Sequence, residues 1–235
     1  MRISDLLITI WWYPFMVVVT FIFAIAAIVV SFFSPDGHLS HLVARIWGRL
    51  LIKGAFCKVK ICGLEKLKPE ESYLFVANHS SSFDIFLLNG YLPYEFRWIS
   101  KPLYFKVPFL GWGMKKAGYI LIYRDKPRQA VKALGNAIEK MKQGFSIAIF
   151  PEGTRSRTGT LQPFKKGMIV IAIKANKSIV PITIKNAYKA KPSSGFLVKH
   201  CEISILIHDP VMIIKKKEED ECLERIRNTI ATGLS

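Results

Sequence analysis

A histidine and an aspartate stand five positions apart in the otherwise small or apolar stretch VANHSSSFDIF (76–86). If Asp84 folds back on His79, its carboxylate accepts a hydrogen bond from one ring nitrogen, which fixes the tautomer that a general base requires. The structural alternative is a histidine in a turn, followed by an acid that favours the dipole at a helix N-terminus. A serine nucleophile is the weaker explanation, because adjacent residues seldom have that geometry and no G-x-S-x-G elbow is present. The spacing predicts that His79 is a base acting on the hydroxyl of a bound molecule and that Asp84 orients it.

The second stretch whose residue types could bind a ligand or take part in a reaction is IFPEGTRSRTG (149–159), at the end of the apolar run FSIAIF. Backbone N–H groups, a hydroxyl and a guanidinium converge at Gly153, Thr154 and Arg155, and together they predict an anion site. Glu152 is unusual there unless it accepts from a hydroxyl of the ligand or holds Arg155 in place. The alternative is a solvated turn with an Arg–Glu ion pair.

Three further cations are candidates for the same anion: Lys101, Lys106 and Arg124, the last expected at the end of a strand. A scatter of solvated side chains is the alternative explanation for any one of them.

The elements that must position these residues are short strands alternating with helices. The clearest helical pattern covers 127–144, where apolar residues recur at steps of three or four, and 223–234 is a weaker one. This alternation predicts an α/β fold, a single domain over residues 57–235 with a mostly covered, mixed sheet. His79 and the 149–159 loop each follow a strand, where α/β proteins place their chemistry. Apolar, β-branched or aromatic segments predict the strands: 58–62, 72–78, 96–100, 119–124, 145–151, 178–186 and 201–208.

The N-terminal segment predicts a membrane helix. Residues 6–35 contain no charge and no histidine, a run long enough to cross about 30 Å of hydrocarbon and too long for a signal peptide. Trp11, Trp12 and Tyr13 are expected as interfacial anchors, and Pro14 as a kink or a helix start.

The next segment, 38–56, predicts an amphipathic basic helix, apolar side toward the membrane and His41, Arg45, Arg49 and Lys53 toward headgroups. An ordinary core-packing helix is the alternative. Residues 1–56 are thus interpreted as a two-helix membrane anchor, which either crosses the bilayer once or forms a re-entrant hairpin in one leaflet.

The net charge and the cysteine spacing indicate which classes of partner and site are expected. The net charge of +17 favours anionic membranes or other polyanions, and most of the excess lies after residue 56, which favours the cytoplasmic side of a cell inner or plasma membrane. The four cysteines form no close pair, so neither a metal site nor a disulfide framework is expected. The charge run 215–221 is interpreted as solvated.

Four stretches, in order over about residues 58–210, are similar to the motifs of the bacterial-type 1-acyl-sn-glycerol-3-phosphate acyltransferases in the glycerolipid acyltransferase family. The second departs from the family's commoner residues between 119 and 123. The motifs and their matches are N-H-x-x-x-x-D at 78–84, G-x-I-x-I-x-R at 118–124, F-P-E-G-T-R-S at 150–156 and a V-P-[IV] strand at 179–182.

The resemblance implies acyl transfer from acyl-CoA or acyl-carrier protein to the 2-hydroxyl of lysophosphatidate, giving phosphatidate, with no cofactor and no metal. It implies His79 as the catalytic base and Asp84 as the residue that orients it. In this acyl transfer, either Lys101 or the backbone amides near residues 80–82 would donate to the oxyanion. An apolar groove for the acyl chain is expected, with Tyr104, Phe105, Phe109 and Trp112 either lining it or lying in the core. The implied substrate-binding residues are Lys101, Arg124, Glu152, Gly153, Thr154 and Arg155.

Three alternatives remain at this point. The first is an acyltransferase for glycerol 3-phosphate or another lysophospholipid, and the second is a hydrolase that releases free fatty acid without an acceptor. The third is a basic membrane-bound module without enzymatic activity, which would bind nucleic acid or acidic lipid with a steep salt dependence. Nucleic acid is not expected as a partner of the acyltransferase.

Overall fold

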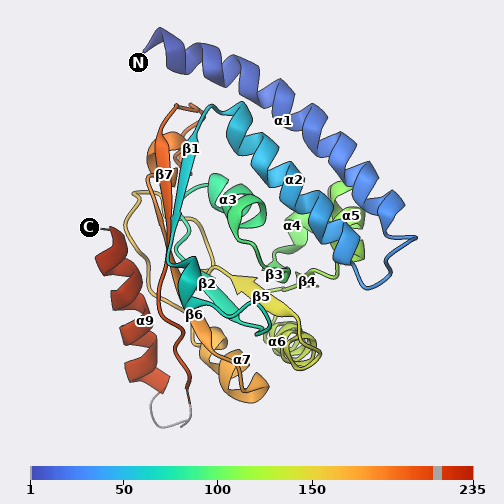
Figure 1. Ribbon diagram of the computed structural model, residues 1–235, viewed down its shortest axis with the longest axis vertical. Coiled ribbons are helices and arrows are strands. Elements are labelled where there is room, and N and C mark those ends of the chain that lie inside the picture. The colour runs from blue at the N-terminus through green and yellow to red at the C-terminus, as the bar shows by residue number, and fades with distance from the viewer. Residues whose placement is uncertain (1, 214–218, 235) are drawn as a thin grey trace.

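The computed structural model describes residues 2–213 and 219–234 and shows a seven-stranded mixed sheet between two layers of helices (Figure 1). The strand order is β1-β7-β6-β2-β5-β3-β4. The five strands from β6 to β4 are parallel, whereas β7 runs antiparallel to β6 and parallel to β1. The strands are β1 Lys58–Cys62, β2 Leu74–Ala77, β3 Phe96–Ser100, β4 Ile120–Leu121, β5 Ser146–Ile149, β6 Ile179–Lys185 and β7 Glu202–Ile207.

All seven segments expected as strands contain one, so the α/β prediction with a mixed sheet is confirmed. The central strands β2 and β5 are buried at every position, as expected for apolar runs without alternation. The strand expected over 119–124 is shorter: β4 ends at Leu121, so Arg124 lies beyond the strand rather than on it. The solvated charge run, 215–221, falls mostly outside the described residues.

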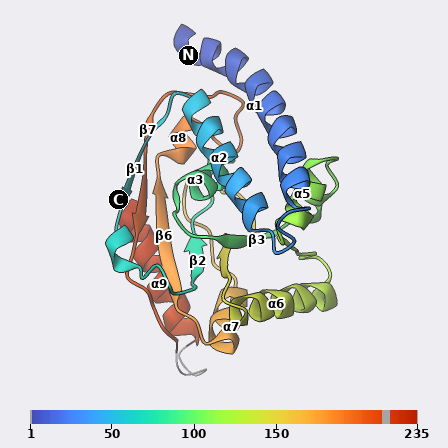
Figure 2. The ribbon, with the colours of Figure 1, turned by 45° about the vertical axis from the view of Figure 1, so that its right-hand side comes forward.

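Helices cover both faces of the sheet (Figures 1 and 2). One core cluster lies beneath α3, α2, α1 and α8, and a second lies between the sheet and α6, α7 and α9. The short helices α4 and α5 lie near the end of α1, and a 3₁₀ turn, Leu64–Lys66, follows β1. The helices are α1 Ile3–Val30, α2 His38–Gly54, α3 Phe83–Tyr91, α4 Pro102–Phe105, α5 Leu110–Lys116, α6 Pro127–Lys142, α7 Gly167–Ala175, α8 Ala187–Ala190 and α9 Glu219–Leu234.

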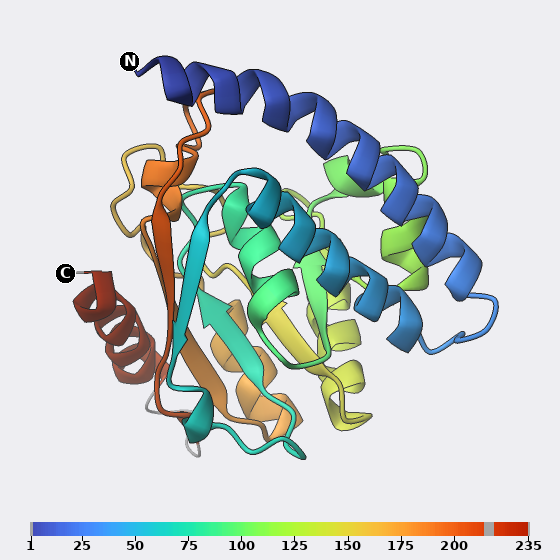
Figure 3. The same ribbon diagram turned by 45° about the horizontal axis from the view of Figure 1, so that its top comes forward.

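The first helix is attached to the rest of the molecule along its length (Figure 3). Near its start, the Thr9 hydroxyl accepts from the Val198 amide at 2.9 Å, and near its end the carbonyl of Ala27 accepts from the Ser40 hydroxyl at 2.9 Å. Pro14 lies inside the helix, so the prediction of a helix start there is wrong.

Of the three aromatic residues at the start of α1, Trp12 does not have the exposed position expected of an interfacial anchor, whereas Trp11 is 53% exposed. Trp12 is buried, and its indole N–H donates to the Leu51 carbonyl at 2.9 Å. The Trp11 indole donates to Gly54 and the Tyr13 hydroxyl donates to the Phe196 carbonyl. The protein itself thus satisfies the polar groups of all three aromatic side chains.

The basic side of α2 also lies otherwise than expected. His41 is buried and contacts the Tyr94 carbonyl, whereas Arg45 and Arg49 donate to carbonyls at and after the C-terminus of α3. Those carbonyls have no partner within their own helix, so the cations satisfy them. The prediction that this side of α2 faces headgroups is therefore wrong for His41 and Arg45, whereas Arg49 and Lys53 are exposed.

Candidate active site

The predicted pair of His79 and Asp84 is present. β2 ends at Ala77, and α3 begins at Phe83 with Asp84 in its first turn. The His79 Nδ1 lies 2.9 Å from Asp84 Oδ2, and the carboxyl group is fully buried. Because a carboxylate accepts and does not donate, Nδ1 carries the ring proton and Nε2 has a free lone pair.

Asp84 is itself held by the backbone. Its Oδ2 accepts from the amides of Ser80 and Ser81, each at 2.8 Å, in addition to the imidazole. The amides of Ser80 and Ser81 are therefore not free to bind an oxyanion, so the prediction that they could donate to one is wrong. The carboxyl group is fixed in place before any ligand binds.

The plane of the imidazole is set by aromatic stacking. The His79 ring lies 3.9 Å from the Phe150 ring, centroid to centroid, with 8° between the planes. Phe150 in turn stacks on Trp98 at 5.0 Å. The side chain of His79 therefore has one orientation, with 11% of its surface exposed.

Sheet topology brings the second motif to the same place. β2 and β5 are adjacent and parallel, with Val76 opposite Ile149, so the segments that follow them leave the same edge of the sheet. Glu152 Oε1 accepts from the His79 amide at 2.6 Å, and the His79 carbonyl accepts from the Ser156 amide at 2.8 Å. The two loops are thus joined through the backbone of His79.

Glu152 has a different position from the one expected. Its second oxygen accepts from the Gln162 amide at 3.0 Å, so both oxygens are occupied by backbone. It does not line the cavity described below, and no ion pair with Arg155 exists within the described residues. Burial raises the pKa of Glu152 to about 7. The residue therefore joins loops rather than facing a ligand.

Three of the predicted cations, Lys101, Arg124 and Arg155, line one cavity together with His79, Gly153 and Thr154. Burial, followed by the positive charges of Arg124, Arg155 and Lys165, lowers the pKa of Lys101. Burial also lowers the pKa of Arg124, whose buried Nη1 has no hydrogen-bond partner among the described residues. Such a group is costly unless a ligand satisfies it.

Gly153 allows these cations to approach the loop. Its φ is +79°, and an added Cβ would lie 2.9 Å from Arg124 Nη1 and 3.1 Å from Lys165 Cε. Only glycine fits both the conformation and the close contact. Lys165 was missed by the sequence reasoning, and Lys106, which was considered, does not line the cavity.

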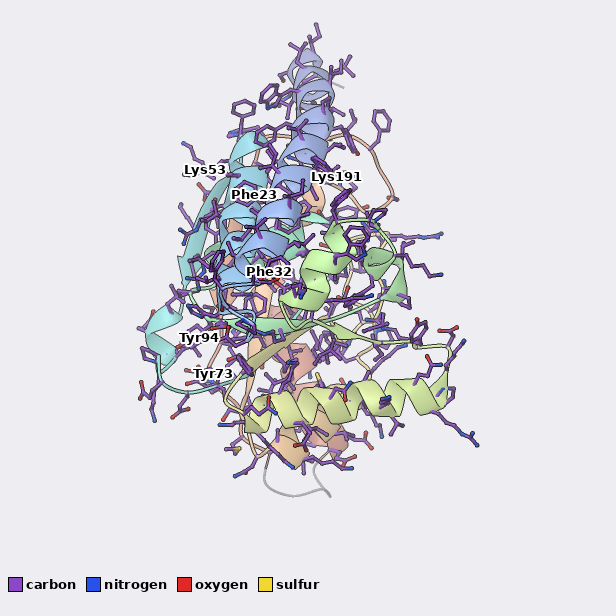
Figure 4. The ribbon with its side chains drawn as sticks, turned by 90° about the vertical axis from the view of Figure 1, so that its right-hand side faces the viewer. Phe23, Phe32, Lys53, Tyr73, Tyr94 and Lys191 are labelled. Carbon is purple, nitrogen blue, oxygen red and sulfur yellow. The ribbon has the colours of Figure 1, made fainter. Side chains whose placement is uncertain are left out.

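The whole cavity has a volume of about 280 Å³, and the rest of its lining is mainly apolar and comes largely from helices in the N-terminal part of the chain. Of the four aromatic residues expected in an acyl groove, only Tyr104 lines it; Phe105 is buried elsewhere, and Phe109 and Trp112 are exposed. Figure 4 labels Phe23 on α1, one of the lining side chains. The apolar lining includes Phe23, Ala24, Ala27, Val43, Ala44, Trp47, Leu103, Leu110 and Met114.

Comparisons with known proteins agree with this arrangement. A family model described as Acyltransferase matches residues 58–185. The chain is 36% identical over 197 residues to the chloroplastic 1-acyl-sn-glycerol-3-phosphate acyltransferase BAT2 of Brassica napus, covering 83% of this chain and 56% of that protein. It is 30% identical to the 1-acyl-sn-glycerol-3-phosphate acyltransferase of Saccharomyces cerevisiae, covering 89% of this chain and 71% of that one.

A solved structure is also similar over nearly the whole chain. The crystal structure of the 1-acyl-sn-glycerophosphate (LPA) acyltransferase PlsC from Thermotoga maritima superposes with a TM-score of 0.83 at 26% identity. The match covers 98% of this chain and 95% of that one. By contrast, the chain spans between 48% and 62% of the length of three plant and algal relatives.

Proposed function

This chain belongs to the acyltransferase family of the 1-acyl-sn-glycerol-3-phosphate acyltransferases, and from that premise we propose that it acylates the 2-hydroxyl of 1-acyl-sn-glycerol 3-phosphate to give phosphatidate. The acyl donor is a thioester, acyl-CoA or acyl-carrier protein. The observation that supports the proposal most is that one cavity is lined by a paired histidine, unpaired cations and a long apolar wall. These three features suit a hydroxyl, a phosphate and an acyl chain, respectively.

In the proposed reaction, His79 Nε2 takes the proton of the 2-hydroxyl while the hydroxyl oxygen attacks the thioester carbonyl. The tetrahedral intermediate collapses by breaking the carbon–sulfur bond, and the proton passes from the imidazolium to the leaving thiolate. Asp84 stabilises the imidazolium through the 2.9 Å bond to Nδ1. General-base catalysis of this kind contributes about 10²–10⁴-fold to the rate.

The phosphate of the acceptor is assigned to Arg124, Arg155 and the backbone at Gly153 and Thr154. Arg124 supports this assignment most strongly, because its buried Nη1 lacks a partner among the described residues. Lys165 lies close enough to Gly153 to add its charge. Lys101 remains a candidate for the oxyanion, since the two serine amides already donate to Asp84.

We also propose that the protein lies on an anionic cell membrane on its cytoplasmic side, with α1 in one leaflet. α1 is the one described helix long and apolar enough to span a membrane, with a hydropathy of 2.6 over 18 residues, but signal sequences and core helices can also pass this test. Its inner side is bonded to the protein from Thr9 to Ala27, so it is not free to leave the domain and cross alone. This favours the one-leaflet geometry of the two that the sequence left open.

Product analysis tests the proposed reaction. Purified protein in detergent is mixed with acyl-CoA or acyl-carrier protein donors and with lysophosphatidate, glycerol 3-phosphate or neutral lysolipids, and lipids are separated by mass. We expect phosphatidate from lysophosphatidate only. Free fatty acid without an acceptor would instead indicate a hydrolase, and preferential acylation of glycerol 3-phosphate would contradict the assigned acceptor.

A further inference from the structure

The α4–α5 segment, residues 102–116, has an apolar outer surface that the mechanism above does not use. Leu103 is 67% exposed and Trp112 is 53% exposed, and Val107 and Phe109 are exposed beside them. Placing side chains of this size in water is unfavourable, and a contiguous group of them marks an interaction site more often than chance. The segment lies against the C-terminal half of α1 (Figure 3).

The outer surface of the segment is continuous with that of α1. The Phe109 ring lies 5.1 Å from the Phe21 ring of α1 and 5.2 Å from the Trp112 ring. Phe21 is itself half exposed. Figure 4 shows α1 and α5 side by side, with Phe32 near the end of α1. The two elements therefore present one apolar surface, in which Phe109 forms the junction.

The backbone at this junction is strained. Phe109 has φ +61° and ψ −55°, and the Leu110 amide donates to the Pro108 carbonyl at 2.7 Å, which is the rarer form of γ-turn. A bulky residue at positive φ costs on the order of 1–3 kcal/mol. The turn places the Phe109 ring on Phe21 at the surface, where it is 36% exposed.

The charges around this surface suit an anionic lipid layer. Lys106, Lys115 and Lys116 are exposed at its borders, and the sequence holds no acidic residue between Glu95 and Asp125. Lys116 Nζ lies 5.5 Å from the centre of the Phe32 ring. Apolar side chains flanked by lysines on flexible stems are typical of elements that lie in a membrane interface.

We propose that the 102–116 segment is a second lipid-contacting element, which inserts Phe109 and Trp112 into the same leaflet as α1 and opens the cavity sideways to the bilayer. Leu103 is both exposed and part of the cavity lining, so the rim of the cavity lies at this surface. Tyr104 and Leu110 line the cavity from the inner side of the same segment. Acyl chains thus reach the cavity from the membrane without crossing water; this consequence alone rests on the proposed function.

Vesicle binding tests the proposal with a matched pair of variants. One variant combines Phe109→Ser and Trp112→Ser; the control is Val131→Ser on α6, where the side chain is 68% exposed but lies outside this surface. At limiting amounts of phosphatidylcholine–phosphatidylglycerol vesicles, we expect the double variant to partition on the order of ten-fold more weakly than wild type. The control should bind like wild type.

A second measurement does not depend on the double variant folding. Bromine on the lipid acyl chains quenches tryptophan that enters the bilayer, so the emission of wild type minus that of Trp112→Phe reports on Trp112 alone. We expect this difference emission to be quenched in brominated vesicles and unaffected in buffer. An unquenched difference, or an equal loss of binding in Val131→Ser, would overturn the proposal.

Other occupants of the surface give distinct results, each of which overturns the proposal. If the double variant kept its vesicle binding while the molecular mass of its particle in detergent fell from that of a dimer to that of a monomer, the surface would join two copies of the chain. If it kept vesicle binding but lost turnover only with acyl-carrier protein donors, the surface would dock the carrier. Turnover of lysophosphatidate in detergent micelles is measured separately, so failure of the proposed reaction is distinguishable from failure of the membrane contact.

Discussion

The two polar ends of the cavity differ in how complete they are. At the His79 end, Asp84 holds the imidazole and accepts two backbone amides, and Glu152 accepts two more. At the cation end, Lys101 and Arg124 have no ion-pair partner within the described residues, and a buried guanidinium nitrogen is unpaired. The protein's own backbone holds most of the His79 end, where Asp84 Oδ1 is the buried carboxylate atom without a partner among the described residues. The cation end carries positive charge that an anion would satisfy.

This difference indicates that the two ends contribute to different steps, the His79 end to the reaction rate and the cation end to substrate affinity. A preorganised base lowers the barrier because it does not have to reorganise during the reaction. An unsatisfied cation cluster gains most of its stabilisation when the ligand binds, and so contributes to affinity. We therefore expect changes at the His79 end to act on kcat and changes at the cation end to act on KM.

The largest expected effect follows from removing the base. His79→Ala should lower kcat by about 10²–10⁴-fold, while the unfolding temperature stays close to that of wild type, because the two serine amides still bind Asp84. Steady-state kinetics and thermal unfolding measure both. A near-native kcat in this variant would show that His79 is not the base. It would also contradict the assignment of kcat effects to the His79 end and KM effects to the cation end.

A smaller effect is expected from opening the cation end. Arg124→Ala should raise the KM for lysophosphatidate by roughly 10–100-fold, the value of one charge-assisted hydrogen bond, with little change in kcat. Inorganic phosphate should raise the unfolding temperature of wild type and do so less in the variant.

The matched control for this change is Arg128→Ala, which removes an exposed arginine of the same charge at the start of α6. It should leave KM and the effect of phosphate unchanged. Equal KM values in the two variants would show that net charge alone, rather than the position of Arg124, attracts the acceptor.

The smallest expected effect concerns stability against pH. The pKa of Glu152 is raised by burial from 4.5 to about 7, so the folded state binds its proton more tightly than the unfolded state does. Its contribution to the free energy of unfolding is therefore greatest below about pH 4.5 and declines as pH rises through about 7, by on the order of 1–3 kcal/mol.

Glu152→Gln removes the titration, so the unfolding temperature of wild type minus that of the variant should decrease from pH 5 to pH 8. Thermal unfolding at a series of pH values measures this difference. A difference that is constant with pH would mean that Glu152 titrates normally and that water reaches its carboxyl group more freely than its burial indicates.

Features that depend on residues close together in the sequence were predictable. Buried strands follow from continuous apolar runs, and the five-residue spacing of His79 and Asp84 is spanned by one turn at a helix start. The anion loop was located because its composition departs from that of its neighbours. In each case the determining interactions lie within a few residues of one another, so the pattern of side chains is enough.

Long-range packing decided the rest. The cations of α2 turned toward α3 because unpaired carbonyls at its C-terminus lie there, and Glu152 turned toward backbone amides brought close by β2 and β5. The apolar wall of the cavity comes from α1 and α2, which nothing in the acyltransferase motifs indicates.

The sequence by itself therefore determined the α/β class, the pairing of His79 with Asp84, and the presence of cations near a strand end, because those depend on local pattern and residue type. The tertiary structure alone decided which cations share a cavity with His79, which acid braces the loops and which helices enclose the apolar space. Those outcomes depend on which polar groups are left without partners when distant segments meet, and that is known only once the chain is folded.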